Sequence, residues 1–299
     1  MNIYSAISAN KNKTWAIMLL FVLVITTVVF VFSKALGYGW GFAGIALILA
    51  GITSIGSYYY SDKLVLATSG AKQIQKKDNP ELFRIVENLC IGDGLPTPRI
   101  YIINDPAPNA FATGRDPKHS VVCVTSGILQ ILDKSELEGV IAHELSHVKN
   151  YDIRLMGIVA ILVGFIAIAS NLFTNQLWFG GVRNDREDRG NAQSLFLIIG
   201  IVLAILSPIA ATLIQLAVSR KREFLADASG ALLTRYPQEL ANALEKLSKS
   251  PYSVKTANNA TAHLFIVNPF KGKNTKQMFT SLFDTHPPIE ERIKILRSM

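Results

Sequence analysis

Four long stretches of this chain are mostly apolar and contain no charged residue, and they constrain the fold more than any other feature. The stretches are Trp15–Ser33, Ala35–Tyr60, Leu155–Val182 and Gly190–Ser219. Each supplies the roughly 20 apolar residues that an α-helix needs to cross the hydrocarbon core of a bilayer. The composition agrees, because 49% of the residues are hydrophobic and the mean hydropathy is +0.29. The sequence therefore predicts a mainly α-helical, multi-pass membrane protein with four transmembrane helices.

The last two apolar stretches leave part of this topology open. Pro208 lies near the middle of the fourth stretch, and a proline kinks a helix because it has no N–H for the bond to residue i−4. The third and fourth stretches either cross the bilayer as two helices or form a tight hairpin that crosses only in part.

Positively charged residues gather beside the apolar stretches. The chain has 30 Lys and Arg against 22 Asp and Glu, a formal net charge of +8. Lys11 and Lys13 precede the first stretch, and the run Arg220–Arg222 follows the fourth. Cytoplasmic loops of membrane proteins carry an excess of Lys and Arg. We therefore expect both termini and all polar segments to face the cytoplasm, with the lipid bilayer rather than a nucleic acid as the partner.

The predicted spans divide the chain into four segments. Residues 1–61 form a membrane hairpin of two spans, and residues 153–219 form a second one. Residues 62–152 and 220–299 are the two parts of one cytoplasmic domain, because the second hairpin interrupts it. We expect this domain to be α+β, with a small β-sheet contributed by its first part.

Local signals place several elements in the first part of this domain. Asn79 followed by Pro80 is typical of a helix start, because asparagine caps the helix and proline suits its first position. Ser135 with Glu138 three residues later predicts a capping box at the start of another helix. Three short β-type runs between these helices predict the sheet: Arg99–Ile103, Asn109–Thr113 and Val121–Thr125.

The helix after Ser135 contains the motif His-Glu-x-x-His. Its histidines, His143 and His147, are four residues apart and therefore share one helix face, so both imidazoles can reach one metal ion. Glu144 can lean over the open side of that ion and take a proton from a water molecule. The alternative is a pair of ordinary surface or core histidines. The amphipathic pattern and the low total of five histidines favour the metal site.

A catalytic zinc ion usually needs a third protein ligand. A third histidine six residues after the motif is excluded, because that position is Ile153. Glu223 and Asp227 lie four apart on a predicted helix, where Glu223 could bind metal while Asp227 accepts a hydrogen bond from a ligand imidazole. The same pattern also fits an ordinary charged helix start beside a membrane span, so spacing alone leaves the choice open. The other candidates for the third ligand are His119, His263 and His286.

The chain resembles the HtpX family of heat-shock membrane metalloproteases, relatives of the zinc-dependent CAAX prenyl proteases. The two predicted spans before the motif and the two after it also fit that family. The stretches that carry the resemblance are Asn109–Gly114, His143–His147 with Asn150 and Asp152, Arg222–Asp227, and Thr285–Pro287.

The resemblance implies the chemistry of the site. It implies a zincin-type catalytic domain with one Zn²⁺ ion held by His143, His147 and Glu223, and with Glu144 as the catalytic base. It also implies an active site at the cytoplasmic face of the cell inner membrane. The expected substrates are misfolded or damaged membrane proteins, whose peptide bonds the enzyme would cut during the stress response and protein quality control.

Two weaker features gain a meaning from the resemblance. Asn109 and Ala110 begin an edge strand that would bind an extended substrate backbone; the plain alternative is a sheet strand without that role. His286 would donate a hydrogen bond to the developing oxyanion, and its plain alternative is a histidine that caps the helix after Pro287. His119 and His263 are most simply surface or core residues.

Two other functions fit parts of the pattern. The first is an intramembrane zinc protease, but Lys149, Asp152 and Arg154 directly follow the motif, and charges at the bilayer centre are costly. The second is a metal-binding membrane protein without hydrolytic activity, such as a transporter. Transporters place ionisable residues within their spans, and the predicted spans here have none.

Overall fold

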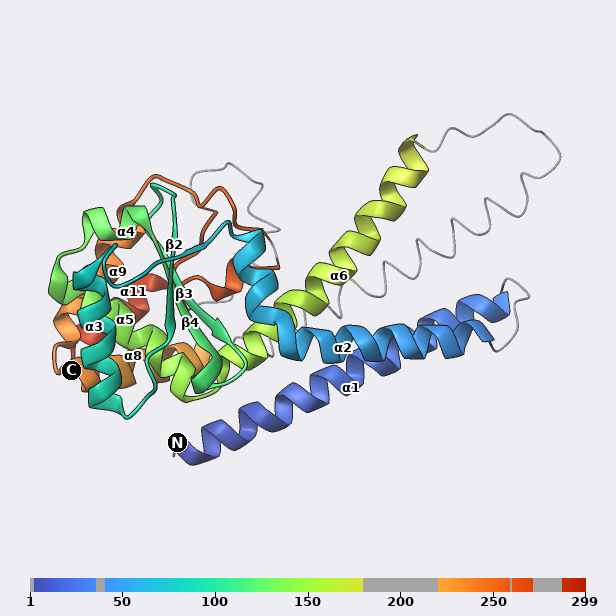
Figure 1. Ribbon diagram of the computed structural model, residues 1–299, viewed down its shortest axis with the longest axis horizontal. Coiled ribbons are helices and arrows are strands. Elements are labelled where there is room, and N and C mark those ends of the chain that lie inside the picture. Colours follow the sequence, from blue (N-terminus) through green and yellow to red (C-terminus); the bar gives the residue numbers. More distant parts are fainter. Residues whose placement is uncertain (1–2, 36–40, 180–219, 259, 271–286) are drawn as a thin grey trace.

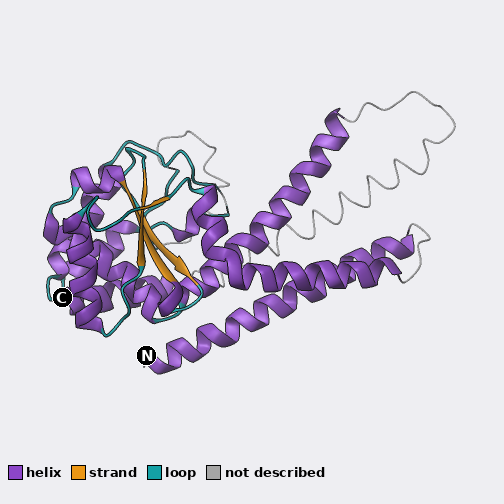
Figure 2. Ribbon diagram, viewed as in Figure 1, coloured by secondary structure: helices purple, strands orange, loops and turns teal. Residues whose placement is uncertain are grey.

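Most of the chain is helical, and a small sheet lies within its globular part (Figures 1 and 2). The computed structural model describes residues 3–35, 41–179, 220–258, 260–270 and 287–299. The elements in chain order are α1 (Ile3–Ala35), α2 (Gly41–Thr68), β1 (Lys72–Gln73), α3 (Pro80–Asp93), β2 (Arg99–Ile103), β3 (Ala110–Gly114), η1 (Pro117–His119), β4 (Ser120–Thr125), α4 (Ser126–Ile131), α5 (Lys134–Lys149), α6 (Asp152–Phe179), α8 (Arg220–Thr234), α9 (Pro237–Lys249), η2 (Ala262–Leu264) and α11 (Ile289–Arg297).

The sheet is mixed and has the strand order β1-β2-β4-β3. Strands β2 and β4 are parallel, whereas β3 pairs with β4 in antiparallel orientation, with Ala110 opposite Val124 and Gly114 opposite Ser120. The three strands predicted from the β-type runs are confirmed to within one residue. Strand β3 lies at the edge of the sheet, and this places it beside the helix that carries the two histidines.

Both faces of the sheet are covered, and β4 shows why. Successive side chains of a strand point to opposite faces. Val122 and Val124 accordingly join the core formed with α3, α5 and α9, while Val121 and Cys123 join the core formed with α1, α2 and α6. All six residues of β4 are buried, which explains why its sequence is a continuous apolar run rather than an alternating one.

The helix boundaries test the local signals. Helix α3 begins as predicted: the side chain of Asn79 accepts a hydrogen bond from the Leu82 N–H at 3.0 Å. The capping box predicted at Ser135 and Glu138 is wrong. Asp133 caps α5 instead, with a reciprocal pair of bonds to Glu136 at 3.0 and 2.9 Å. The same four-residue pattern occurs two positions earlier in the chain, and the Asp133 carboxylate there also accepts a hydrogen bond from the Ser135 hydroxyl at 2.9 Å.

Helices α1, α2 and α6 extend away from the globular part (Figure 1). Within the described part of the chain, no helix is both long enough and apolar enough to cross a membrane. The predicted spans at Trp15–Ser33, Ala35–Tyr60 and Leu155–Val182 are thus not confirmed. The fourth, Gly190–Ser219 with Pro208, lies outside the described residues.

Candidate metal centre

Helix α5 presents both motif histidines to one point. His143 and His147 are buried, and their Nε2 atoms are 3.2 Å apart. The i, i+4 spacing on one helix face produces this pairing, as the motif predicted. Two imidazole nitrogens at this separation, both turned to the same space, suit a shared metal ion.

Helix α8 crosses α5 and adds a carboxylate to the pair. Glu223 Oε1 is 3.4 Å from His147 Nε2, and Glu223 Oε2 is 3.8 Å from His143 Nε2. The close approach depends on Gly230, because a Cβ atom at this position would lie 2.9 Å from the backbone nitrogen of His143. A glycine in α8 therefore lets its backbone touch that of α5.

The three groups fit a tetrahedral ion. His143, His147 and Glu223 form a buried group whose ligand atoms lie within 4.8 Å of one another. Ligand atoms about 2.0–2.2 Å from a zinc ion, at tetrahedral angles, lie roughly 3.3–3.6 Å from each other. The two Nε2 atoms are 3.2 Å apart, and each has a different Glu223 oxygen nearby, Oε1 at 3.4 Å from His147 and Oε2 at 3.8 Å from His143, so the spacing is close to that range. Two histidines with one carboxylate are also a donor set that catalytic zinc uses, with the fourth position left open.

Glu144 lies beside the first histidine and is 2% exposed. Burial disfavours the charged carboxylate and raises the pKa of Glu144 to about 7. The backbone N–H of Ala112 in β3 donates a hydrogen bond to this carboxylate. A carboxylate with a pKa near neutral is suited to general base and acid chemistry, because it both takes and returns a proton near pH 7.

Each ligand histidine is held from behind by an aspartate. Asp227 Oδ1 is 2.9 Å from His143 Nδ1, and Asp152 Oδ2 is 3.0 Å from His147 Nδ1. A carboxylate at Nδ1 orients the ring so that Nε2 faces the metal. The spacing of Glu223 and Asp227 predicted this contact for Asp227. No such role was predicted for Asp152, which follows Tyr151, where a φ of 59° turns the chain sharply after α5.

Arg292 of α11 is a buried cation next to the metal centre, and the sequence did not predict this role for it. Its guanidinium donates two hydrogen bonds to Asp227, at 2.8 and 2.7 Å, and a third to the Ile266 carbonyl at 3.0 Å. Burial alone would raise the pKa of Asp227, but the neighbouring Arg292 lowers it to about 2. In the sequence, Arg292 resembles any basic residue of an amphipathic helix.

Part of the strand that we expected to bind substrate is already hydrogen-bonded to another segment of this chain. The Asn109 side chain donates to the Val267 carbonyl at 3.0 Å, and the Ala110 carbonyl accepts from the Ile266 N–H at 3.0 Å. In an antiparallel pair the backbone groups of alternate residues point away from the partner strand, so those of Ala112 face outward like those of Ala110. Asn109 and Ala110 thus anchor residues 266–267 against the strand.

The remaining histidines lie elsewhere. His119 is exposed and contacts Asp116 at 2.8 Å, and His263 is buried with Nε2 3.1 Å from the Met156 carbonyl. Neither belongs to the group of three ligands. The predicted oxyanion donor, His286, lies outside the described residues.

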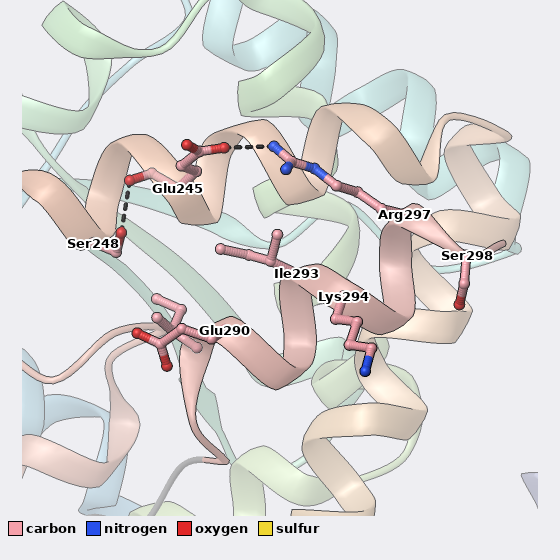
Figure 3. A pocket seen from close by; sticks show the side chains of 8 residues that line it. Glu245, Ser248, Glu290, Ile293, Lys294, Arg297 and Ser298 are labelled. Atoms are coloured by element: carbon pink, nitrogen blue, oxygen red, sulfur yellow. Dashed lines mark hydrogen bonds and ion pairs between the residues drawn. The ribbon is translucent and has the colours of Figure 1, made fainter.

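A separate pocket lies between α9 and α11 (Figure 3). Arg297 of α11 points toward Glu245 of α9, and the two form an ion pair across its rim. None of the lining residues is one of the three metal-ligand candidates. The pocket is lined by Glu245, Ser248, Ile289, Glu290, Ile293, Lys294, Arg297 and Ser298.

Comparisons with known proteins agree with this geometry. The model of the family described as Peptidase family M48 matches residues 76–299. A protein named Protease HtpX homolog from Dictyoglomus thermophilum is 45% identical over 99% of this chain and 94% of its own length. Proteins of the same name from Tropheryma whipplei and Lactobacillus helveticus are 47% and 46% identical over 99% of this chain, and over 98% and 100% of their own lengths.

One solved structure shares the fold. The crystal structure of S. mikatae Ste24p matches with a TM-score of 0.53 and 19% sequence identity. The match covers 94% of this chain and 62% of that chain. At this identity the likeness concerns the fold alone.

Proposed function

This chain belongs to peptidase family M48 and is a metalloprotease, and we propose that its metal is one zinc ion held by His143, His147 and Glu223. The observation that carries the proposal is the buried group of three residues whose ligand atoms lie within 4.8 Å of one another, with the two Nε2 atoms 3.2 Å apart. This donor set suits tetrahedral zinc, and three protein ligands would leave the fourth position of such an ion to the reacting groups.

The mechanism assigns one role to each side chain. A bound zinc ion supplies a Lewis acid that makes a carbonyl more electrophilic and a water molecule more acidic. Glu144 takes a proton from the attacking water and returns it to the nitrogen of the leaving amine. Asp227 and Asp152 hold the two imidazoles in place through their Nδ1 atoms. His286 remains our proposed oxyanion donor.

We place the substrate backbone on the outer edge of β3. The outward groups of Ala112 lie next to Glu144, whose carboxylate accepts the Ala112 N–H. An extended peptide that adds to this edge brings its scissile bond close to the base. Asn109 and Ala110 act in substrate binding as the anchor of residues 266–267, which continue this edge.

We further propose that the enzyme is anchored in the cell inner membrane by α1, α2, α6 and residues 190–219. This topology divides the chain into 1–61, 62–152, 153–219 and 220–299, with both termini and the site at the cytoplasmic face. The supporting observation is that α1 and α2 expose large apolar side chains, which suit lipid better than water. These are Leu19, Leu20, Leu23, Ile45, Leu47, Ile48, Leu49, Ile52 and Ile55.

The substrates that suit this placement are unfolded or damaged membrane proteins, and nucleic acid has no part in the function. A site beside the bilayer receives loops and tails that emerge from it. The names of the relatives, Protease HtpX homolog, support the proteolytic activity, and the role that we propose for it is protein quality control under stress.

The test is cleavage of an unfolded model protein by the detergent-purified wild type and by Glu144→Gln, with the zinc content measured for both. We expect about one zinc ion in each protein and cleavage by the wild type alone, abolished by a chelator. Equal cleavage by Glu144→Gln would refute the role of Glu144. An absence of zinc from both proteins would refute the metal assignment.

A further inference from the structure

The first turns of α1 lie against the turn that joins α5 to α6, close to the metal centre. Asn10 is only 3% exposed there, although it belongs to a helix that otherwise extends away from the globular part (Figure 1). Its side-chain nitrogen donates to the Asn150 carbonyl at 2.8 Å and to Asp152 Oδ1 at 2.6 Å. A buried amide with two such bonds holds its partners in a fixed geometry.

One of these partners is the aspartate behind a metal ligand. Asp152 uses Oδ1 to accept from Asn10 and Oδ2 to contact His147 Nδ1 at 3.0 Å. We propose that Asn10 is a positioning residue of the metal centre, which acts on His147 through Asp152. The proposal rests on the function proposed above, because it requires His147 to bind the metal.

The chemistry of the partners explains why an amide suits this position. A backbone carbonyl and a carboxylate only accept hydrogen bonds, and the NH₂ group of asparagine offers two hydrogens without adding a charge. Arg222 Nη1 lies 3.4 Å from the same Asp152 oxygen. Without Asn10, the attraction of this arginine for Oδ1 would no longer be balanced by the bond from the amide and would draw the carboxylate away from His147.

The neighbouring contacts show that α1 holds the whole turn. Tyr151 adopts a φ of 59°, which is unfavourable for a residue with a bulky side chain. The Lys11 ammonium lies 4.5 Å from the centre of the Tyr151 ring, and the Arg154 guanidinium lies 4.9 Å from it. Helix α1 thus contacts Asn150, Tyr151 and Asp152 in succession, and it supports the backbone that carries Asp152.

The consequence is that a helix outside the family match contributes to metal binding. The match to family M48 begins at residue 76, whereas α1 ends at Ala35. The proposed membrane anchor and the metal centre are then one cooperative unit, and a change in α1 alters the affinity for zinc.

The experiment uses the full chain in detergent and compares Asn10→Ala with Asn12→Ala. Asn12 is exposed on the same helix, so it is a matched control. Zinc dissociation constants come from competition with a chromophoric chelator. Removal of a group behind a metal ligand typically weakens metal binding by about 10- to 100-fold. We expect a loss in this range for Asn10→Ala and none for Asn12→Ala.

A double-mutant cycle separates positioning from a general structural role. If Asn10 acts through Asp152, Asn10→Ala weakens zinc binding in the wild type and has no further effect in Asp152→Ala, which removes both carboxylate oxygens. Losses that multiply independently in the double variant would overturn the proposal. So would an unchanged zinc affinity of Asn10→Ala together with a lower unfolding temperature of its metal-free form, because that result indicates only structural support.

The experiment distinguishes failure of the proposed metal site from failure of the inference about Asn10. A wild type that binds no zinc would refute the metal site itself, and the inference about Asn10 with it. Tight zinc binding by the wild type, by Asn12→Ala and equally by Asn10→Ala would refute the inference alone and leave the metal site intact.

Discussion

Arg292 is the residue whose replacement tests the buried charges of this site most directly. Its guanidinium is 1% exposed and donates two hydrogen bonds to Asp227, which in turn contacts His143. Arg292→Met replaces the arginine by an unbranched apolar side chain of similar length and so removes the charge. The variant leaves Asp227 as a buried carboxylate without its cation, and it leaves the Ile266 carbonyl without one donor.

The expected loss of stability follows from two estimates. The pKa of Asp227 is about 2 against an ordinary value of 3.8, a difference that corresponds to roughly 2 kcal/mol of stabilisation at neutral pH. The uncompensated buried charge adds to this loss, and breaking a buried ion pair typically costs about 3–5 kcal/mol. We adopt the larger range, which lowers the unfolding temperature of a domain of this size by about 10 °C.

The pH dependence has a definite sign. Because the folded-state pKa of Asp227 is depressed, its contribution is fully present above pH 3.8 and is lost only as the pH falls toward 2. In Arg292→Met, burial is opposed only by the contact with His143, so the pKa of Asp227 rises and the carboxyl takes up a proton at a higher pH than in the wild type. The difference in stability between the two proteins should therefore shrink on acidification from pH 7 to about 4.5.

The assay is thermal unfolding of the zinc-stripped proteins in detergent, followed by far-UV circular dichroism. Arg297→Met is the matched control, because Arg297 lies on the same helix and forms an exposed ion pair with Glu245. Exposed pairs contribute at most about 1 kcal/mol. If Arg292→Met is no less stable than Arg297→Met at pH 7, the argument that Asp227 depends on its buried cation is refuted.

Three further predictions concern other parts of the structure. Gly230→Ala should destabilise the protein by about 1–3 kcal/mol and weaken zinc binding, because the new methyl group would lie 2.9 Å from the His143 backbone nitrogen. Gly92→Ala is the control, because its methyl group would lie 3.5 Å from a side chain and should be tolerated. Chemical denaturation and zinc titration would contradict the prediction if the two variants behaved alike. Burial lowers the pKa of His147, but the carboxylates of Asp152 and Glu223 outweigh it and raise the pKa, so zinc binding near pH 7 should release a proton. The measurement is calorimetry of zinc binding in buffers of different ionisation enthalpy, and equal binding heats in all buffers would contradict the prediction. Burial raises the pKa of Cys90 to about 11, so its thiol should resist alkylation at pH 8 until the protein unfolds, as mass spectrometry of the labelled native protein can check.

The parts of this protein that depend on neighbouring residues in the chain could be read from the sequence. The start of α3 follows from Asn79 and Pro80, and the strands follow from short apolar runs between turn residues. The pairing of His143 and His147 follows from four residues of helix. In each case the interacting groups are at most a few positions apart, so propensity and periodicity predict the contact.

The local signals fail where two of them compete. Asp133 and Ser135 both begin a pattern that can cap α5, and the one that caps it uses an additional hydrogen bond from the Ser135 hydroxyl. The pattern of residues in the sequence does not show whether that additional hydrogen bond forms. Only the folded geometry shows which of the two helix starts is more stable.

The groups that surround the metal ligands come together through the packing of separate helices. From its spacing, Glu223 could equally be a metal ligand or a charged residue at an ordinary helix start. The close approach of α8 to α5 at Gly230 brings it to the histidines. Arg292 reaches Asp227 across 65 positions of sequence, and Asn10 reaches Asp152 across 142. Such contacts have no periodicity along the chain, because packing of separate helices creates them. The sequence determined which helix carries the chemistry, and the packing of the helices determined which charges hold it in place.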